Sequence, residues 1–384
     1  MNEESPVIRY HQAKRGKIEV IPKTPLDTAE HLSLAYTPGV AEICRVIANE
    51  PETAQILTNR SNTVAIVTDG SAILGLGNIG PTAGLPVMEG KSMIFKKMAD
   101  IDAVPLCIDT QDTEEIIRFC KQIEPTFGGI NLEDIAAPRC FEILDRLEKE
   151  LTIPVFHDDQ DGTAIVVLAG LTNAAKLRKT PLEEMSVVIN GAGAAGIAIA
   201  RLLNYRGVGD IILADSKGIV ESSRTDLNPY KLDVAEMTNP RRLSGSLDDA
   251  LRGADAFIGV SVRDILSEDH IRSMADRPII FAMANPDPEI LPESAKKAGA
   301  FIVGTGRSDY PNQINNALVF PGIFRALLDS RLKQSAYSIS ANLMGVKLAA
   351  AEAIASVVVP TRERLLPSVM DPSVVKTIYD ALRS

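Results

Sequence analysis

The stretch SVVINGAGAAGIAIARLLNYRGVGDIILAD, Ser186–Asp215, decides the fold of this chain. It begins with a short β-branched run, passes through a glycine-rich turn, continues with the apolar spacing of a helix, and ends in a second apolar run that closes at Asp215. The turn consists of Gly191, Ala192, Gly193, Ala194, Ala195 and Gly196. A strand, a G-x-G-x-x-G turn, a helix and a second strand ending in an acid predict a dinucleotide-binding βαβ unit.

Each part of this unit suits a bound dinucleotide. Gly191 permits the tight turn, Gly193 lets the backbone approach a pyrophosphate, and Gly196 lets the helix pack closely on the strand. The helix N-terminus offers unpaired N–H groups and a partial positive charge. Asp215 would accept hydrogen bonds from both ribose hydroxyls, which favours NAD over NADP, although Lys217 is near enough to weaken the preference. The alternative is a strand–helix turn without a ligand.

A second stretch, Gly75-Leu-Gly77-Asn-Ile-Gly80, also fits G-x-G-x-x-G. It does not follow its strand directly, a proline comes at once after it, and no clean strand ending in an acid follows at the right distance. We interpret it as a glycine-rich loop of another site.

Composition limits the class of protein. A length of 384 residues indicates about two domains, and a net charge of −10, aromatic content of 4% and no Trp disfavour nucleic acid and anionic membranes as partners. No apolar run is long enough to span a membrane, and the polar N-terminus argues against a targeting peptide. The four cysteines form no C-x-x-C pair, which predicts reduced thiols and a cytoplasmic protein.

Strands and helices are predicted to alternate along most of the chain. The predicted strands are 64–67, 103–108, 128–132, 154–156, 187–189, 211–213, 254–259, 278–282 and 301–303. The predicted helices include 41–47, 91–99, 113–123 with Thr113 as cap, 139–150, 164–177, 323–332, 338–357 and 373–382. This order predicts an α/β fold: a smaller N-terminal catalytic domain (1–160), a Rossmann-like doubly wound nucleotide domain (161–325) and a helical segment (326–384) that packs back on the first domain.

Three acids follow the ends of predicted strands, namely Glu133, Asp134 and Asp159. Ligands of an open parallel sheet collect outside the carboxyl ends of its strands. Three carboxylates that converge there would repel one another without a cation, and all-oxygen ligation suits Mg²⁺ or Mn²⁺. The alternative for each acid is a helix cap or a solvated surface position.

Lys91 follows Gly90 and is expected near the start of a helix. The helix dipole and partial burial would both disfavour its charged form, which makes it a candidate general base. The alternative is a solvated lysine. Tyr36, in a Tyr-Thr-Pro-Gly turn, is on its own more easily explained as structural.

From about residue 15 to near its end, the chain resembles the short bacterial form of the malic enzyme family. The resemblance rests on stretches 33–40, 68–80, 87–91, 131–134, 156–164, 191–196, 281–286 and 304–322. It implies oxidative decarboxylation of L-malate to pyruvate and CO₂ with NAD or NADP and with Mg²⁺ or Mn²⁺. A relative that acts as a metal-dependent oxaloacetate decarboxylase without net redox chemistry, and a non-enzymatic NAD-dependent sensor, are the alternatives.

The resemblance also implies roles for particular residues. Tyr36 is the general acid and Lys91 the general base, with Asp158 as its partner. Glu133, Asp134 and Asp159 hold the metal. The cofactor and substrate contacts fall to Asn285, Asn315 and Asn316. A homodimer is expected by analogy at the level of the fold, because a two-domain enzyme with a helical C-terminal segment often uses such helices at a two-fold interface.

Two positions depart from the family pattern. The loop 71–73 reads Ser-Ala-Ile where longer members carry an arginine that clamps a substrate carboxylate. Asp161 stands where a neutral or basic residue is usual, and an extra acid there could strengthen cation binding or weaken dianion binding.

Overall fold

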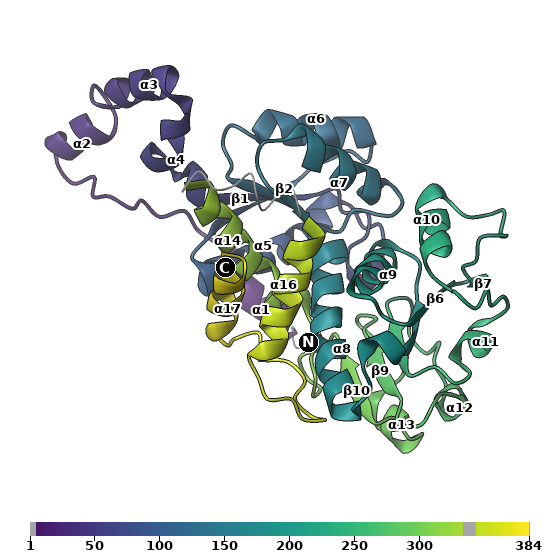
Figure 1. The fold of residues 1–384 in the computed structure, drawn as a ribbon. Coiled ribbons are helices and arrows are strands. Elements are labelled where there is room, and N and C mark those ends of the chain that lie inside the picture. Colours follow the sequence, from purple (N-terminus) through teal and green to yellow (C-terminus); the bar gives the residue numbers. More distant parts are fainter. Residues whose placement is uncertain (1–4, 333–342, 384) are drawn as a thin grey trace.

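The computed structural model describes residues 5–332 and 343–383 (Figure 1). The first sheet is parallel, in the order β2-β1-β3-β4. Its strands are β1 Thr63–Thr68, β2 Asp102–Cys107, β3 Gly129–Leu132 and β4 Val155–His157. β1 is buried along its whole length because helices cover both faces of the sheet, as its unbroken apolar run predicts.

The second sheet has the order β10-β9-β8-β5-β6-β7 and is parallel except for its edge strand β7. Its strands are β5 Ser186–Asn190, β6 Asp210–Asp215, β7 Gly218–Ile219, β8 Ala256–Gly259, β9 Ile279–Ala282 and β10 Ile302–Thr305. The order reverses at β5, which pairs with β6 on one side and with β8 on the other. The predicted doubly wound sheet is therefore present, and its switch point lies beside the glycine-rich turn.

Helices surround both sheets. They are α1 Pro6–Gln12, α2 Ala29–Ala35, α3 Val40–Asn49, α4 Ala54–Leu57, α5 Pro81–Ala99, α6 Thr113–Ile123, α7 Arg139–Glu150, α8 Thr163–Arg178, α9 Ala194–Arg206, α10 Pro229–Met237, α11 Leu247–Leu251, α12 Glu268–Ser273, α13 Pro292–Lys297, α14 Phe320–Leu332, α16 Leu343–Ser356 and α17 Ser373–Ala381. None of the described helices is long and apolar enough to cross a membrane.

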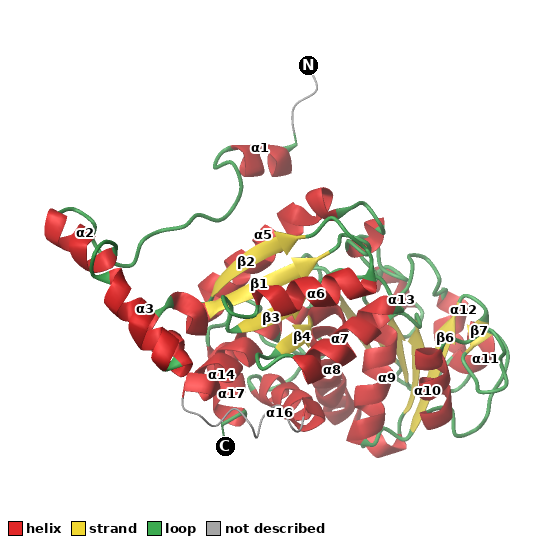
Figure 2. Cartoon of the chain, turned by 90° about the horizontal axis from the view of Figure 1, so that it is seen from above, coloured by secondary structure: helices red, strands yellow, loops and turns green. Residues whose placement is uncertain are grey.

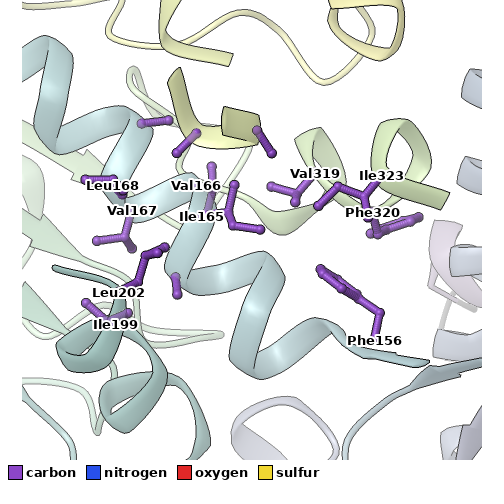
Figure 3. Close-up of a cluster of buried hydrophobic side chains, with 14 of the residues drawn as sticks. Phe156, Ile165, Val166, Val167, Leu168, Ile199, Leu202, Val319, Phe320 and Ile323 are labelled. Carbon is purple, nitrogen blue, oxygen red and sulfur yellow. The ribbon is translucent and has the colours of Figure 1, made fainter. Parts of the chain in front are cut away.

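The helix α8 joins the two sheets and is buried on nearly all sides. Figure 3 shows its side chains Ile165, Val166 and Val167 in one apolar cluster with residues of α9 and α14. α14 packs on α5 of the first sheet, whereas α16 packs on α8 and α9. The C-terminal helices thus return to the first sheet, as predicted, and also brace the helix that links it to the second.

Three expectations about local structure need correction or fall outside the described residues. α5 begins at Pro81 and contains Gly84, Pro86 and Gly90, so Lys91 lies inside this helix and not at its N-terminus. Asp112, not Thr113, caps α6: its side chain accepts a hydrogen bond from the Glu115 N–H. The predicted helix 338–357 begins among residues outside the described part of the chain, and the described helix covers Leu343–Ser356. The domain boundaries at 160 and 325 stay a prediction.

The N-terminal residues form an arm, defined here as residues 18–57, that projects from the body of the protein (Figures 1 and 2). Its helices α2, α3 and α4 bury no residue. Large apolar side chains are nevertheless frequent on it, including Val20, Ile21, Leu26, Leu34 and Ile56. The arm is therefore an apolar surface that its own chain leaves uncovered.

Candidate functional site

A cleft of about 510 Å³ lies between the carboxyl ends of the two sheets. The first sheet contributes the ends of β3 and β4 together with α5, and the second contributes the ends of β8, β9 and β10 together with Ala195 of α9. The predicted site residues that line the cleft are Lys91, Glu133, Asp134, Asp159, Ala195, Asn285, Asn315 and Asn316. Both strand-end positions are where parallel sheets bind ligands.

Within the described part of the chain, Lys91 is the only lysine or arginine that lines the cleft. It is 7% exposed, its Nζ lies 2.7 Å from Glu133 Oε2 and forms an ion pair with Asp158, and the ring of Phe320 lies below it. Burial by itself would lower the pKa of Lys91, but the two carboxylates outweigh burial and raise it well above its usual value. This is opposite to the direction that the sequence predicted, because neither the position within α5 nor the two partners could be read from it.

The three predicted metal ligands converge: each of Glu133, Asp134 and Asp159 offers an oxygen, and these oxygens lie within 4.8 Å of one another. Burial, followed by the negative charge of Asp159, raises the pKa of Asp134 to about 8. Burial also raises the pKa of Glu133. The buried Asp134 Oδ2 has no hydrogen-bond partner. A hard divalent cation would give this unpartnered oxygen a ligand bond and would offset the repulsion between the carboxylates, so these residues fit such a cation.

Backbone geometry holds these acids in place. Asp134 has φ 53°, and its N–H donates to Asp159 Oδ2 at 2.8 Å. Asn131 donates to Glu133 Oε2 at 2.9 Å. Asp158 and Asp159 both belong to a π-helical turn, Asp158–Gly162, between β4 and α8. A Cβ at Gly162 would lie 1.9 Å from Asp158 Oδ1, so only glycine lets the turn close on the partner of Lys91.

The glycine-rich turn at β5 is shaped as predicted. Gly191 has φ 121°, and a Cβ there would lie 2.5 Å from the carbonyl oxygen of Val260 at the end of β8. A Cβ at Gly196 would lie 1.7 Å from the Gly191 carbonyl oxygen, so this glycine permits the close helix–strand contact. At Gly193 no atom lies within 4 Å of the Cβ position. The open approach to the N-terminus of α9 fits a pyrophosphate group.

Asp215 ends β6, as predicted, but it is not free. Its carboxylate pairs with Arg224 at 2.9 Å and with Lys231 at 2.6 Å, and it accepts a hydrogen bond from the Lys217 N–H. These hydrogen bonds outweigh burial and lower its pKa. Sequence reasoning considered only Lys217, whose ammonium instead pairs with Asp226. Arg224 and Lys231 lie in a loop and a later helix, where no motif marks them.

The three asparagines reach the cleft from two loops after β9 and β10. Asn285 is exposed, and its amide donates to the Met283 carbonyl. Asn315 accepts a hydrogen bond from the Ala317 N–H at 2.8 Å. The loop of the second glycine pattern meets them: a Cβ at Gly75 would lie 1.9 Å from the Asn285 carbonyl oxygen. That loop thus forms part of the cleft wall, as the sequence suggested.

Tyr36 is not brought to the cleft by its own chain. It ends α2 on the arm, is 67% exposed, and does not line the cleft. Asp161 also lies outside the cleft lining: it is 4% exposed and pairs with Lys347 of α16. Neither position could be foreseen, because both depend on packing between distant parts of the chain.

The comparisons with known proteins agree over almost the whole chain. Residues 15–148 match the family described as malic enzyme, N-terminal domain, and residues 160–377 match malic enzyme, NAD binding domain. The chain is 54% identical to an NAD-dependent malic enzyme of Geobacillus stearothermophilus, over 96% of this chain and 76% of that one. It is 52% identical to a bifunctional malic/malolactic enzyme of Bacillus subtilis (strain 168), over 98% and 91%.

Two further comparisons bear on cofactor and fold. An NADP-dependent malic enzyme of Rhizobium meliloti (strain 1021) is 49% identical over 90% of this chain, which spans 45% of that relative. The crystal structure of an NAD-dependent malic enzyme from Thermotoga maritima superimposes with a TM-score of 0.93 at 49% identity, covering 99% of this chain and all of that one.

Proposed function

The chain belongs to the malic enzyme family, and we propose that the cleft between its sheets is the site where it works. It is an enzyme of oxidative malate decarboxylation, which yields pyruvate and CO₂ and reduces NAD(P). The observation that carries the proposal is the convergence of Lys91, the acid triad and the strand ends of the nucleotide-binding sheet on one cleft.

Lys91 is the proposed general base for the C2 hydroxyl of malate. In the structure its ammonium is held by Asp158 and Glu133. A Glu133 carboxylate engaged by a cation would stabilise that ammonium less, and Lys91 would pass one of its protons to Asp158 as it accepts the hydroxyl proton of malate. Burial raises the pKa of Asp158 to about 6, so its proton affinity is closer to neutrality than that of a solvated aspartate.

Glu133, Asp134 and Asp159 are the proposed ligands of Mg²⁺ or Mn²⁺. When bound, such a cation acts as a Lewis acid that stabilises negative charge on the substrate oxygen as CO₂ leaves. Removal of divalent cations by a chelator is expected to abolish malate-dependent NADH formation, with activity restored by Mn²⁺. Full activity after exhaustive chelation would overturn the assignment.

Substrate recognition falls to amides in this proposal. Asn285, Asn315 and Asn316 line the same cleft as Lys91 and can donate hydrogen bonds to a carboxylate. No arginine lines this cleft within the described residues, and Lys91 is assigned to the C2 hydroxyl, so we assign the C4 carboxylate to these neutral donors. Asn285 lies in the loop after β9 and lines the same cleft as Ala195 of the glycine-rich turn, so we also propose it as a contact of the nicotinamide.

NAD is the proposed preferred cofactor, bound at the turn Gly191–Gly196 with its adenosine ribose at Asp215. The negative charge of Asp215 disfavours a 2′-phosphate. Arg224 and Lys231 moderate that charge and stand ready to pair with a phosphate if the acid is removed. The preference therefore depends on one carboxylate between two cations.

Tyr36 is the proposed general acid that protonates C3 of the enolate. Its phenol O–H is a proton donor and can transfer its proton to a carbon on which negative charge builds up. Tyr36 lies on the exposed arm and does not line the cleft of its own chain. This role therefore requires the arm to reach the cleft of another copy of the chain. The uncovered apolar residues of the arm suit a second copy of the chain, so we propose a homodimer in which the arm contributes to the interface.

A metal-dependent oxaloacetate decarboxylase without redox chemistry is the less favoured alternative, since the nucleotide-binding turn has its full geometry. The discriminating experiment supplies L-malate, NAD and Mn²⁺ and follows NADH. Formation of pyruvate from oxaloacetate without NADH from malate would favour the alternative. A cytoplasmic location stays a prediction from composition.

A further inference from the structure

Asp161 faces away from the cleft although it belongs to the same turn as Asp158 and Asp159. Its Oδ1 lies 2.6 Å from Nζ of Lys347, whose side chain is 15% exposed on α16. Both residues border a separate cavity of about 140 Å³ between α7, β4, α14 and α16. The acid that departs from the family pattern is therefore not directed at the cation or the substrate; its partner is a lysine of the C-terminal helices.

The Asp158–Gly162 turn connects Asp161 directly to two residues of the site. Asp158 and Asp159 lie three and two residues before it, and Gly162 directly after it closes against Asp158. The other side of the turn packs on α8 and α9. A shift of Asp161 would accordingly move the partner of Lys91 and one member of the acid triad together.

The charged groups around Lys347 indicate that Asp161 is its main counter-ion. Burial by itself would lower the pKa of Lys347, but the negative charge and hydrogen bond of Asp161, together with the negative charge of Glu148, outweigh burial and raise it. Glu148 is the second acid nearby, and burial raises its pKa to about 7, so it is a weaker counter-ion at neutral pH. The positive charge of Arg201 acts in the opposite direction and lowers the pKa of Lys347. Asp161 is thus the main counter-ion that keeps the ammonium of Lys347 at this position.

We propose that Lys347 is a positioning residue: its ion pair with Asp161 anchors the Asp158–Gly162 turn to α16 and so sets the placement of Asp158 and Asp159. The inference rests on the acid triad being the metal site. It gives the C-terminal helices a role in metal binding and in the proton relay without contact to either.

The test is a double-mutant cycle on the full-length enzyme with K347M, D161N and the double variant, and with K347R as the charge-conserving variant. Mn²⁺ affinity is measured by titration calorimetry on metal-free protein, and kcat, malate KM and thermal unfolding are measured on each variant. K376M, which breaks the exposed Lys376–Asp380 pair on α17, is the matched control.

We expect K347M to weaken Mn²⁺ binding by about 10-fold or more, the size of effect seen when a residue that positions metal ligands is lost. We expect K347R to retain binding. Each single variant leaves one buried charge without its partner and loses thermal stability, whereas the double variant regains stability. Mn²⁺ affinity and kcat stay low in the double variant, because the anchor is still absent. K376M is expected to match the wild type in both.

A double variant with wild-type Mn²⁺ affinity would overturn the inference, since the pair would then serve folding alone. Should K347M or D161N fail to fold, the double variant decides. The metal site is tested separately by D159N: unchanged Mn²⁺ binding in D159N would contradict the proposed ligands, whereas loss of binding in D159N with intact binding in the double variant would contradict only the role of Lys347.

Discussion

At the scale of single residues, the site depends on charges that compensate one another. Lys91 is buried between Asp158 and Glu133, and Asp215 is held between Arg224 and Lys231. In each group, removal of one member leaves the others without the charge that stabilises them, because burial leaves little water to replace the missing partner. The effects of substitutions at these positions should therefore differ from those of exposed charges on the same elements.

Lys91→Ala is expected to lower kcat by about 10²–10⁴-fold, the usual contribution of a positioned base. Lys97→Ala is the matched control, since Lys97 is an exposed lysine of the same helix. Steady-state kinetics with L-malate measure both. An equal loss in the two variants would show that the defect comes from α5 as a whole and not from the base.

Asp215→Ser is expected to raise the ratio of kcat/KM for NADP to that for NAD. The substitution removes the repulsion of a 2′-phosphate and frees Arg224 and Lys231 to pair with it. Lys217, whose ammonium pairs with Asp226, provides the comparison: Lys217→Ala should change the ratio less. An unchanged ratio in Asp215→Ser would mean that the acid does not contact the ribose.

The acid triad predicts a pH dependence for the metal-free protein. The pKa of Asp134 is 3.8 for an ordinary aspartate and about 8 in the fold, so the folded state binds more protons between these values. Stability without metal should therefore fall as pH rises from 4 to 8, whereas Mn²⁺ affinity should rise over the same range because binding needs the carboxylates. Thermal unfolding with chelator and with Mn²⁺ measures both trends. In Asp134→Asn, the contribution of this carboxyl group to the pH dependence of stability and of Mn²⁺ affinity should disappear. If both pH dependences persist unchanged, other groups cause them.

At the scale of elements, sequence patterns predicted strands better than the limits of helices. The βαβ unit was predicted correctly because its glycines satisfy local steric demands that any chain must meet there. The start of α5 was missed because Gly84, Pro86 and Gly90 look like breaks, although α5 runs continuously from Pro81. The residue types of the acid triad were predictable from strand ends, whereas the partners of Lys91 and Asp215 required the tertiary structure.

Two substitutions in the glycine-rich turn are expected to distinguish an effect on NAD binding from an effect on folding. Gly193→Ala adds a Cβ where no protein atom lies within 4 Å, so stability without ligand should be retained while the Kd for NAD rises. Gly196→Ala brings a Cβ to 1.7 Å from the Gly191 carbonyl oxygen and should weaken both. Thermal unfolding with and without NAD distinguishes the two. Undiminished NAD binding by Gly193→Ala would place the pyrophosphate elsewhere.

At the scale of the whole molecule, the arm is the feature that one chain does not explain. The sequence indicated helices there, and the structure has them, but no local pattern reveals that Tyr36 and the apolar residues around it stay uncovered. The expected dimer was attributed to the C-terminal helices, whereas the exposed surface points to the arm. A catalytic role for Tyr36 therefore requires that the arm of one chain reaches the cleft of a second chain.

Mixing two inactive variants tests this arrangement. Lys91→Ala and Tyr36→Phe are each expected to be nearly inactive alone, and subunit exchange should restore part of the activity, because a mixed dimer has one cleft with both residues intact. Sedimentation verifies the dimer, and mass spectrometry verifies the exchange. Mixed dimers that stay inactive would mean that Tyr36 serves the cleft of its own chain or is not the acid.

The measurement that tests the central claim most directly follows NADH and pyruvate in one reaction with L-malate, NAD and Mn²⁺, for the wild type and for Lys91→Ala. We expect the wild type to form the two products in equal amounts and the variant to lose both together. Pyruvate formed from added oxaloacetate by a wild-type enzyme that makes no NADH from malate, or undiminished NADH formation by Lys91→Ala, would contradict the assignment of the cleft.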